Sequence, residues 1–512
     1  MSRRRLARRC APLLVVLVGA ALLAVASPAV ARPGGGGGFS GGGGGGGGFG
    51  GGGGFSGGGY RGPGGVGRSP GDDTTGGVTG VTFFLALAFF ALLVASNLRQ
   101  SASWDSRSEP SPRRHAPQLD VIRRLDPEFS AVLFQDFVYA LYARAHHARS
   151  NHEALAALAP YLSARARTAL EAFPLPGAPE TMPTLAVILG AVHVEQVTVP
   201  LPESGGTNVW VVLRIESNVT LGDAGSEQNF YVRETWDLAR NVAVRSKPPE
   251  AVRSFHCPNC GAPFASSGGD RCAFCGEIVS GGRFDWAVMT IRDVSAEARP
   301  PALTGTVEEQ GNDLPTVYQP GLIQNRDALL RDDPAITEAA LEARLRLIYD
   351  QLNLAWTNRD LTPVRPYVSD SLYNYLQYWI DAYERQDLRN VLQNMRILQT
   401  ELAKVVRDRW FSAVTFRIRA TGRDTTVRVD TGELVGGRPH RDREYTEYWT
   451  LIRGAGVRGA PRTDKSCPNC GASLQEAGVN EAGQCAHCGA HITRGEFDWV
   501  LSQIEQDDSY TG

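Results

Sequence analysis

Beyond residue 117, the hydrophobic positions change from a helical spacing to an alternating one, and they do so twice. In the C-terminal part, an apolar stripe with helical spacing comprises Leu341, Leu345, Ile348, Leu352 and Ala355. A second helix is predicted to run from Ser369 toward Glu384. Alternating or β-branched stretches follow and predict strands at 395–404, 410–420, 425–430 and 444–452. Helices followed by strands indicate an α+β fold in which an antiparallel sheet wraps around its helices.

The same order of elements is predicted upstream, at 127–148, 163–173, 185–199, 208–219 and 229–239. Short motifs align between the two halves. Asp126-Pro127 matches Asp333-Pro334, and Pro160-Tyr161-Leu162-Ser163 matches Pro366-Tyr367-Val368-Ser369. We expect Ser163 and Ser369 to be N-caps, because a serine oxygen can accept a hydrogen bond from a first-turn amide. The chain therefore contains an internal duplication.

Each half ends with a cysteine-rich segment and a Gly-x-Phe-Asp-Trp tail, Gly282–Trp286 and Gly495–Trp499. The cysteine spacings are C-x2-C-x11-C-x2-C and C-x2-C-x14-C-x2-C. Such knuckles present four thiolates tetrahedrally to one zinc ion and leave no open position, so the site is structural. Two structural Zn²⁺ ions are expected, with the ligands Cys257, Cys260, Cys272, Cys275, Cys467, Cys470, Cys485 and Cys488. The alternative is two disulfides per set, which a reducing compartment disfavours.

A glycine follows the second cysteine of every knuckle, at positions 261, 276, 471 and 489. A tight turn often needs a positive φ there, which glycine adopts without steric cost. The Phe-Asp-Trp tails are expected to dock back onto their ribbon or domain. The alternative is an exposed Phe/Trp pair that anchors a partner protein.

The N-terminal region has the pattern of a secretory signal peptide at 1–31. An arginine-rich start precedes the apolar run Leu13–Val25, and Ala29-Val30-Ala31 is a small-residue cleavage pattern. Cys10, the ninth cysteine, would leave with this peptide. Residues 32–76 are glycine-rich and cannot pack a core, so a flexible tether is expected.

An uncharged apolar run at 77–97 is long enough to span a bilayer as a helix. Asp72 and Asp73 precede it, whereas Arg99, Arg107 and Arg114 follow it. The positive-inside bias therefore predicts a single-pass protein of the cell membrane whose large C-terminal part lies in the cytoplasm. This topology also favours zinc over disulfides.

Composition and motifs together predict seven segments after residue 76. These are a transmembrane helix at 77–97, a juxtamembrane linker at 98–117, a first domain at 118–250, a first ribbon and tail at 254–292, a linker at 293–332, a second domain at 333–456, and a second ribbon and tail at 464–505.

The Asp-Pro helix start, the Pro-Tyr-[Leu/Val]-Ser helix and a closing Glu-x-Trp-x-Leu-x-Arg strand resemble the domain of the mitochondrial inner-membrane translocase subunit 44-like family. The resemblance covers about 118–242 and 333–456, in two copies. It implies a cone domain like that of nuclear transport factor two, with helices in the concave face of a curved antiparallel sheet around an apolar pocket. It also implies a membrane-proximal binding or tethering role and no reaction.

A pocket enzyme of the isomerase or dehydratase type is the first alternative, since it needs a buried acid and base. The candidates are Asp381, Tyr378 and Glu447, although the pattern favours outer positions for polar residues. Trp236 and Trp449 are expected in the core. His146, His147 and His152 form a histidine cluster that is expected to be solvated at a helix end rather than to bind metal.

A zinc-ribbon protein that binds nucleic acid or ribosomes is the second alternative. The net charge is −2, and neither ribbon carries a basic run that would neutralise phosphates. We therefore expect a non-enzymatic, membrane-anchored protein that holds a protein client or a lipid-like ligand and does not bind nucleic acid.

Overall fold

The computed structural model describes residues 119–173, 182–201, 203, 205–223, 226–252, 255–298, 312, 314–474, 478–507 and 510–512. The predicted signal peptide, glycine-rich segment, transmembrane helix and juxtamembrane linker lie outside the described residues. Among the helices that are described, none has the length and apolar character needed to cross a membrane.

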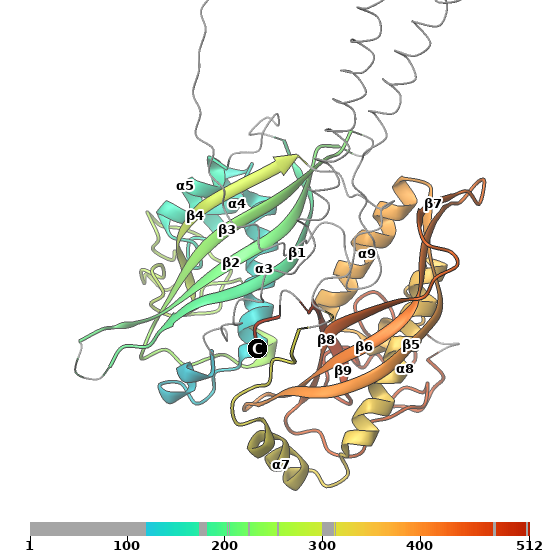
Figure 1. Ribbon diagram of the computed structural model, residues 1–512. Helices are drawn as coiled ribbons and strands as arrows, with labels where there is room; N and C mark the ends of the chain where they lie inside the picture. Colours follow the sequence, from blue (N-terminus) through green and yellow to red (C-terminus); the bar gives the residue numbers. More distant parts are fainter. Residues whose placement is uncertain are drawn as a thin grey trace, which may run out of the picture. The chain divides into compact units, whose positions relative to one another are not determined.

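The first half begins with a helical layer. A short 3-10 helix η1 (Leu119–Arg124) precedes α3 (Ala131–Ala148), α4 (His152–Ala157) and α5 (Ala164–Glu171), and α6 (Pro249–Val252) comes after the third strand. The strands are β1 (Thr184–Thr198), β2 (Asn208–Leu221), β3 (Gln228–Asn241) and β4 (Ala287–Ala298). They form an antiparallel sheet in the order β1-β2-β3-β4, and α3 lies across it (Figure 1).

The second half repeats this arrangement. Its helices are α7 (Leu322–Asp332), α8 (Glu338–Asn358), the 3-10 helix η3 (Arg365–Tyr367) and α9 (Asp370–Arg385). Its strands are β5 (Leu388–Arg407), β6 (Phe411–Arg428), β7 (Leu434–Gly437), β8 (Arg443–Gly454) and β9 (Val500–Gln506). The sheet order is β5-β6-β8-β9, with β7 paired to β6. The predicted α+β class is confirmed, and both halves are consistent with cones of the nuclear transport factor two type.

Register shifts bend the first strand of each sheet. Strand β1 has three of them against β2, and β5 has three against β6. In β5 one shift lies between Gln393 and Arg396, where Asn394 has a φ of 54°. Bulges of this kind kink a strand and increase its twist. They therefore curve each sheet around its long helix.

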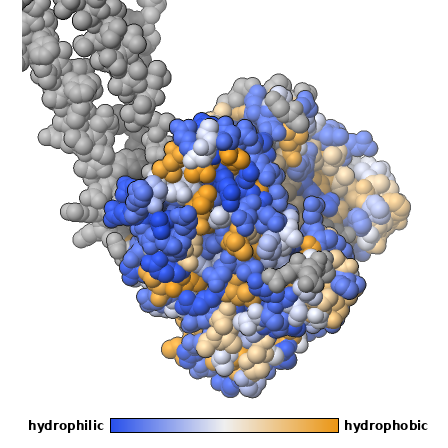
Figure 2. Space-filling view, turned by 90° about the vertical axis from the view of Figure 1, so that its right-hand side faces the viewer, coloured by the Kyte–Doolittle hydropathy of each residue, from blue (hydrophilic) through white to orange (hydrophobic). Residues whose placement is uncertain are grey.

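Large aromatic side chains fill the space between helix and sheet. Trp236 is fully buried in the first core, and Trp356, Trp379 and Trp449 are buried in the second. The predicted core positions of Trp236 and Trp449 agree with this. Burial of such rings supplies a large share of the hydrophobic free energy of folding. On the face shown in Figure 2, hydrophilic residues cover most of the surface and hydrophobic ones form small patches.

The local predictions hold well, and both serine caps are present. The Ser163 hydroxyl accepts from the amide of Ala166 at 3.1 Å, and that of Ser369 accepts from Leu372 at 3.2 Å. Several details differ from the prediction, and α4, β4, β7 and β9 were not predicted. The separate strands expected at 410–420 and 425–430 are the single strand β6, and residues 322–332, which were assigned to a linker, form α7.

The strand that follows each ribbon belongs to the sheet before it. β4 pairs with β3, and β9 pairs with β8. The repeated Pro-Tyr-x-Ser motif meets the start of these strands, because the amide of Ser163 donates to the carbonyl of Val288 and that of Ser369 donates to Leu501. Each ribbon is therefore inserted between the third and the last strand of its sheet order rather than appended to a finished domain.

Candidate functional site

The eight cysteines form two clusters with the geometry of a four-thiolate metal site. Within each set, the four Sγ atoms all lie within 4.8 Å of one another. Cys257 and Cys275 Sγ are 3.9 Å apart, as are Cys467 and Cys488 Sγ. A tetrahedron with zinc–sulfur bonds of about 2.3 Å places sulfurs about 3.8 Å apart. All eight cysteines are free thiols in the structure, and each cluster could hold one metal ion.

The four knuckle glycines have φ values between 70° and 76°, as the turn requires. The repeated Asn of the Cys-Pro-Asn-Cys knuckles also has a role that the spacing alone did not indicate. Asn469 Nδ2 donates to Cys488 Sγ at 3.3 Å. This hydrogen bond is the main cause that lowers the pKa of Cys488 to about 6. The equivalent Asn259 lowers the pKa of Cys275 to about 7. Both asparagines thus favour the thiolate that a metal ion needs.

The first cysteine of each set has the opposite environment. Burial raises the pKa of Cys257 to about 12 and that of Cys467 to about 11. A buried thiolate needs a nearby positive charge, because desolvation penalises the unpaired anion. A divalent metal ion at the centre of the cluster would supply that charge. The donor set therefore fits Zn²⁺, which is bound most often by four tetrahedral sulfur or nitrogen ligands in structural sites.

The Phe-Asp-Trp tails connect each ribbon to its sheet. Phe284 and Phe497 pack against the cysteine clusters, whereas Trp286 and Trp499 are buried in the domain cores or beside them. The predicted docking onto ribbon and domain is confirmed, and both tail tryptophans are buried rather than exposed to a partner, with Trp286 4% and Trp499 0% exposed.

A buried arginine completes this connection in both halves. Arg240 pairs with Asp126 at 2.7 Å, and its guanidinium lies over the ring of Trp286, 4.8 Å from the centroid. The repeated Asp at the helix start, the Arg at the strand end and the Trp of the tail therefore meet at one point. The motifs that revealed the duplication hold the fold together.

The second ribbon also contacts its domain through Arg365. This side chain is 2% exposed, donates from Nη2 to the carbonyl of Glu481 at 2.8 Å, and pairs with Asp370 at 2.7 Å. Thr493 donates to the same Asp370 carboxylate at 2.8 Å. A Cβ on Gly483 would lie 2.0 Å from Thr493 Oγ1, so only glycine fits there. In the first half, Arg167 pairs with Asp270 of the ribbon at 3.0 Å.

The three candidates for acid–base chemistry have separate environments. Asp381 accepts from Gln377 Nε2 at 2.7 Å. Glu447 is buried and accepts from Trp449 Nε1 at 2.9 Å and from Gln506. Tyr378 is buried, and burial raises the pKa of its hydroxyl. Asp381 and Glu447 therefore have different hydrogen-bond partners.

The histidine cluster differs from its prediction. His146 is fully buried and its Nε2 lies 2.6 Å from Glu234 Oε1. His147 contacts the carbonyl oxygen of Thr184, and His152 contacts Glu171. The three rings thus have three different partners, and the expected solvated position is wrong for His146. Its partner lies 88 residues away, which no local pattern could indicate.

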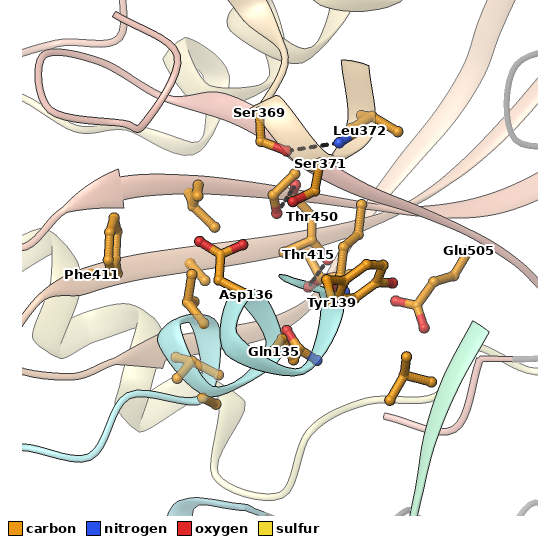
Figure 3. A pocket seen from close by; sticks show the side chains of 18 of the residues that line it. Gln135, Asp136, Tyr139, Ser369, Ser371, Leu372, Phe411, Thr415, Thr450 and Glu505 are labelled. Carbon is orange, nitrogen blue, oxygen red and sulfur yellow. Dashed lines mark hydrogen bonds between the residues drawn. The ribbon is translucent and has the colours of Figure 1, made fainter. Parts of the chain in front are cut away.

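A cavity of about 490 Å³ lies where helix α3 faces the second sheet (Figure 3). Asp136 and Tyr139 come from α3, and Thr415, Thr450 and Glu505 come from β6, β8 and β9. In Figure 3, Tyr139 extends from the helix toward Glu505. Contacts beside the cavity join the two halves, because Leu133 packs with Phe411 and Ile452, and Trp410 Nε1 donates to the carbonyl of Glu128 at 3.0 Å.

Burial shifts the pKa values of the titratable groups in the lining. It raises the pKa of Glu505 to about 6, and Lys404 partly opposes this effect. It lowers the pKa of Lys404, against the attraction of Glu505 and Asp120. It also raises the pKa of Tyr139. Desolvation thus disfavours the charge on each of these groups. Nothing in the sequence indicated this site, because its residues come from both halves.

Comparison with known proteins identifies the class of the second half. Residues 325–462 match the family model of the Tim44-like domain. This bears out the resemblance for one of the two predicted copies, and the model does not extend to the first half. A search of curated proteins found no match. The chain thus contains one recognised Tim44-like domain, preceded by a domain with the same strand order and the same Asp–Arg–Trp contacts.

Proposed function

We propose that this protein is a non-enzymatic, membrane-anchored binding or tethering protein. The match of residues 325–462 to the Tim44-like domain carries this proposal, because such domains are often membrane-associated binding or tethering modules. The client is a protein segment or a lipid-like molecule held near the bilayer. The separate environments of Asp381, Tyr378 and Glu447 support a role in binding rather than in acid–base catalysis.

Each four-cysteine cluster holds one structural zinc ion in this proposal. The buried first cysteine and the hydrogen bond from Asn469 to Cys488 support metal binding. The ribbons are fixed to their domains through buried Trp and Arg side chains, so each ribbon holds the last strand of its sheet in place. A net charge of −2 and the lack of a basic run in the ribbon sequences argue against nucleic acid as the partner.

The proposed topology rests on the N-terminal sequence. After signal cleavage, the helix at 77–97 anchors the chain, and the arginines that follow it keep residues 98–512 in the cytoplasm. Free thiols suit a reducing compartment.

Membrane fractionation with protease treatment tests this proposal. The full chain is expected in the alkali-resistant membrane pellet, and a variant without residues 77–97 is expected in the supernatant. External protease on intact cells is expected to spare the zinc ribbons. Digestion of the C-terminal half from outside, or recovery of the full chain in the supernatant, would contradict the proposed tethering role.

A further inference from the structure

The floor of the cavity is a row of polar side chains that crosses the whole second sheet. Lys404 on β5 is the register partner of Thr415 on β6, Thr415 pairs with Thr450 on β8, and Thr450 pairs with Gln503 on β9. All four residues line the cavity. The two threonine hydroxyls are 2.8 Å apart. Phe416 follows Thr415 on β6, and Trp449 precedes Thr450 on β8. Both are core residues. Because neighbouring side chains on a strand point to opposite faces, the row lies on the sheet face opposite the core.

Opposite charges stand at the two ends of this row. Lys404 lies at the β5 end, and Glu505 lies two residues after Gln503 at the β9 end. Lys404 and Glu505 attract each other through the cavity, but within the described part of the chain neither side chain forms an ion pair or a hydrogen bond. Some other charged groups of the lining do have ion-pair partners. Asp120 pairs with Arg123, and Asp370 pairs with Arg365.

Both side chains are half-buried. A partly desolvated charge without a direct partner is costly, so two charges of opposite sign across one cavity favour complementary groups. Three strand spacings of about 4.8 Å separate the ends of the row at the backbone, roughly 14 Å. The long Lys404 side chain shortens this gap, so the two charges attract each other without forming an ion pair. A ligand with one anionic and one cationic group would satisfy both ends at once.

We propose that this cavity binds a small zwitterion of the amino-acid or dipeptide class, with its carboxylate toward Lys404 and its ammonium group toward Glu505. The threonine hydroxyls and Gln503 offer hydrogen bonds to the polar atoms between the charges. Leu133, Phe411 and Ile452 form an apolar wall that suits a hydrophobic side chain. A volume of about 490 Å³ lies within the range of small-molecule sites.

A ligand with a single charge fits less well. A simple anion would leave the half-buried Glu505 without a direct partner, and a simple cation would leave Lys404 without one, so either ligand would forfeit part of its binding free energy. This inference is independent of the tethering role, because it concerns a small molecule and not the membrane client.

Lysine labelling tests the proposal directly, because the chain has only three lysines, at 247, 404 and 465. The full chain in detergent is treated with a reductive methylation reagent, and each lysine is quantified by mass spectrometry. L-leucyl-L-leucine and L-leucine are the zwitterionic probes. Leucine amide lacks the carboxylate, and N-acetyl-leucine lacks the ammonium group. We expect at least one zwitterion to slow the labelling of Lys404 several-fold at millimolar concentration, with no effect on Lys247 or Lys465.

Calorimetric titration of variants assigns the two ends. E505Q is expected to bind the protecting zwitterion at least tenfold more weakly than the wild type. Its affinity for this zwitterion should then be no higher than its affinity for N-acetyl-leucine. K404M is expected to bind the zwitterion no more tightly than it binds leucine amide. E433Q is the matched control, because Glu433 is exposed in the turn between β6 and β7. We expect this variant to bind the zwitterion with the affinity of the wild type.

Three outcomes would overturn the proposal. One is labelling of Lys404 that no zwitterion slows at 10 mM. Another is equal protection by the amide or the acetylated probe, which would show that one charge suffices. The third is wild-type affinity in both E505Q and K404M. If a variant fails to fold, the labelling of the wild-type protein decides, since it needs no substitution. None of these outcomes bears on the membrane fractionation result.

Discussion

The guanidinium of Arg453 makes a 2.8 Å ion pair with Asp333 and at the same time lies over the ring of Trp499, 4.9 Å from its centroid. Asp333 precedes the long helix α8, Arg453 lies near the end of β8, and Trp499 follows the second ribbon. One side chain therefore fixes three segments that are far apart in sequence. The amide of Gly459 also donates to Asp333 at 2.9 Å, which adds the start of the ribbon segment.

Breaking this pair is predicted to destabilise the second domain strongly. R453M leaves the buried Asp333 carboxylate without its cation, and removal of one partner of a buried pair costs about 3–5 kcal/mol. Urea unfolding followed by tryptophan fluorescence measures this loss. R419Q is the control, because Arg419 and Glu444 form a pair in which both side chains are about half exposed. Its expected cost is below about 1 kcal/mol, and equal losses in the two variants would contradict the assigned role of Arg453.

Cysteine substitution in the second ribbon is predicted to halve the metal content. C467S removes a buried ligand, and metal binding supplies much of the folding free energy of so small a module. Elemental analysis is expected to give two zinc ions per chain for the wild type and one for C467S. G478A changes a residue of the same ribbon that is not a ligand and should retain two zinc ions. An unchanged zinc content in C467S would show that these thiols do not hold the ion.

Gly483→Ala is predicted to loosen the second ribbon from its domain. Gly483 has a φ of 78°, and a Cβ would lie 2.0 Å from Thr493 Oγ1 and 2.9 Å from Arg365 Nη2. The matched control is Gly478→Ala, because Gly478 has a φ of 71° and no atom within 4 Å of the added carbon. Both variants bear the strain of positive φ, about 1 kcal/mol. We expect G483A to lose at least twice as much unfolding free energy as G478A, and similar losses would show that the close contact does not matter.

Glu505 is predicted to make stability depend on pH. Its pKa is raised from 4.5 to about 6 in the folded state, so the folded state binds more protons than the unfolded state between these values. Stability therefore falls as pH rises through this window, and the full cost of about 2 kcal/mol is present above pH 6. The unfolding free energy of E505Q should thus rise relative to the wild type between pH 4.5 and pH 7. E433Q, a change at an exposed carboxylate, is the control, and parallel pH profiles for E505Q and E433Q would contradict the burial effect.

Local sequence patterns predicted much of the fold, because the features concerned depend on neighbouring residues. The apolar stripe beginning at Leu341 predicted α8. Ser163 and Ser369 were predicted as caps, and the knuckle glycines were predicted to have positive φ. The structure confirms each of these predictions. The duplication was visible because the same contacts require the same residue types in both halves.

The remaining features depend on contacts between distant segments. Strands β4 and β9 return to their sheets only after a ribbon has intervened, so no short pattern could pair them. His146 is buried because it contacts Glu234, which lies far away in sequence. Lys404 and Glu505 share a cavity only because α3 covers the second sheet. The asparagines of the knuckles were present in the motif, but their hydrogen bond to the last cysteine is a matter of three-dimensional geometry.

The insertion of each ribbon before the last strand of its sheet sets an order of events during synthesis. The ribosome releases β8 well before β9, and until β9 arrives β8 has an unpaired edge that could template aggregation. The knuckle cysteines emerge in this interval. A shortage of metal in the cell would therefore leave nascent chains with an open β8 edge, and quality-control proteases would remove them before they reached their working concentration.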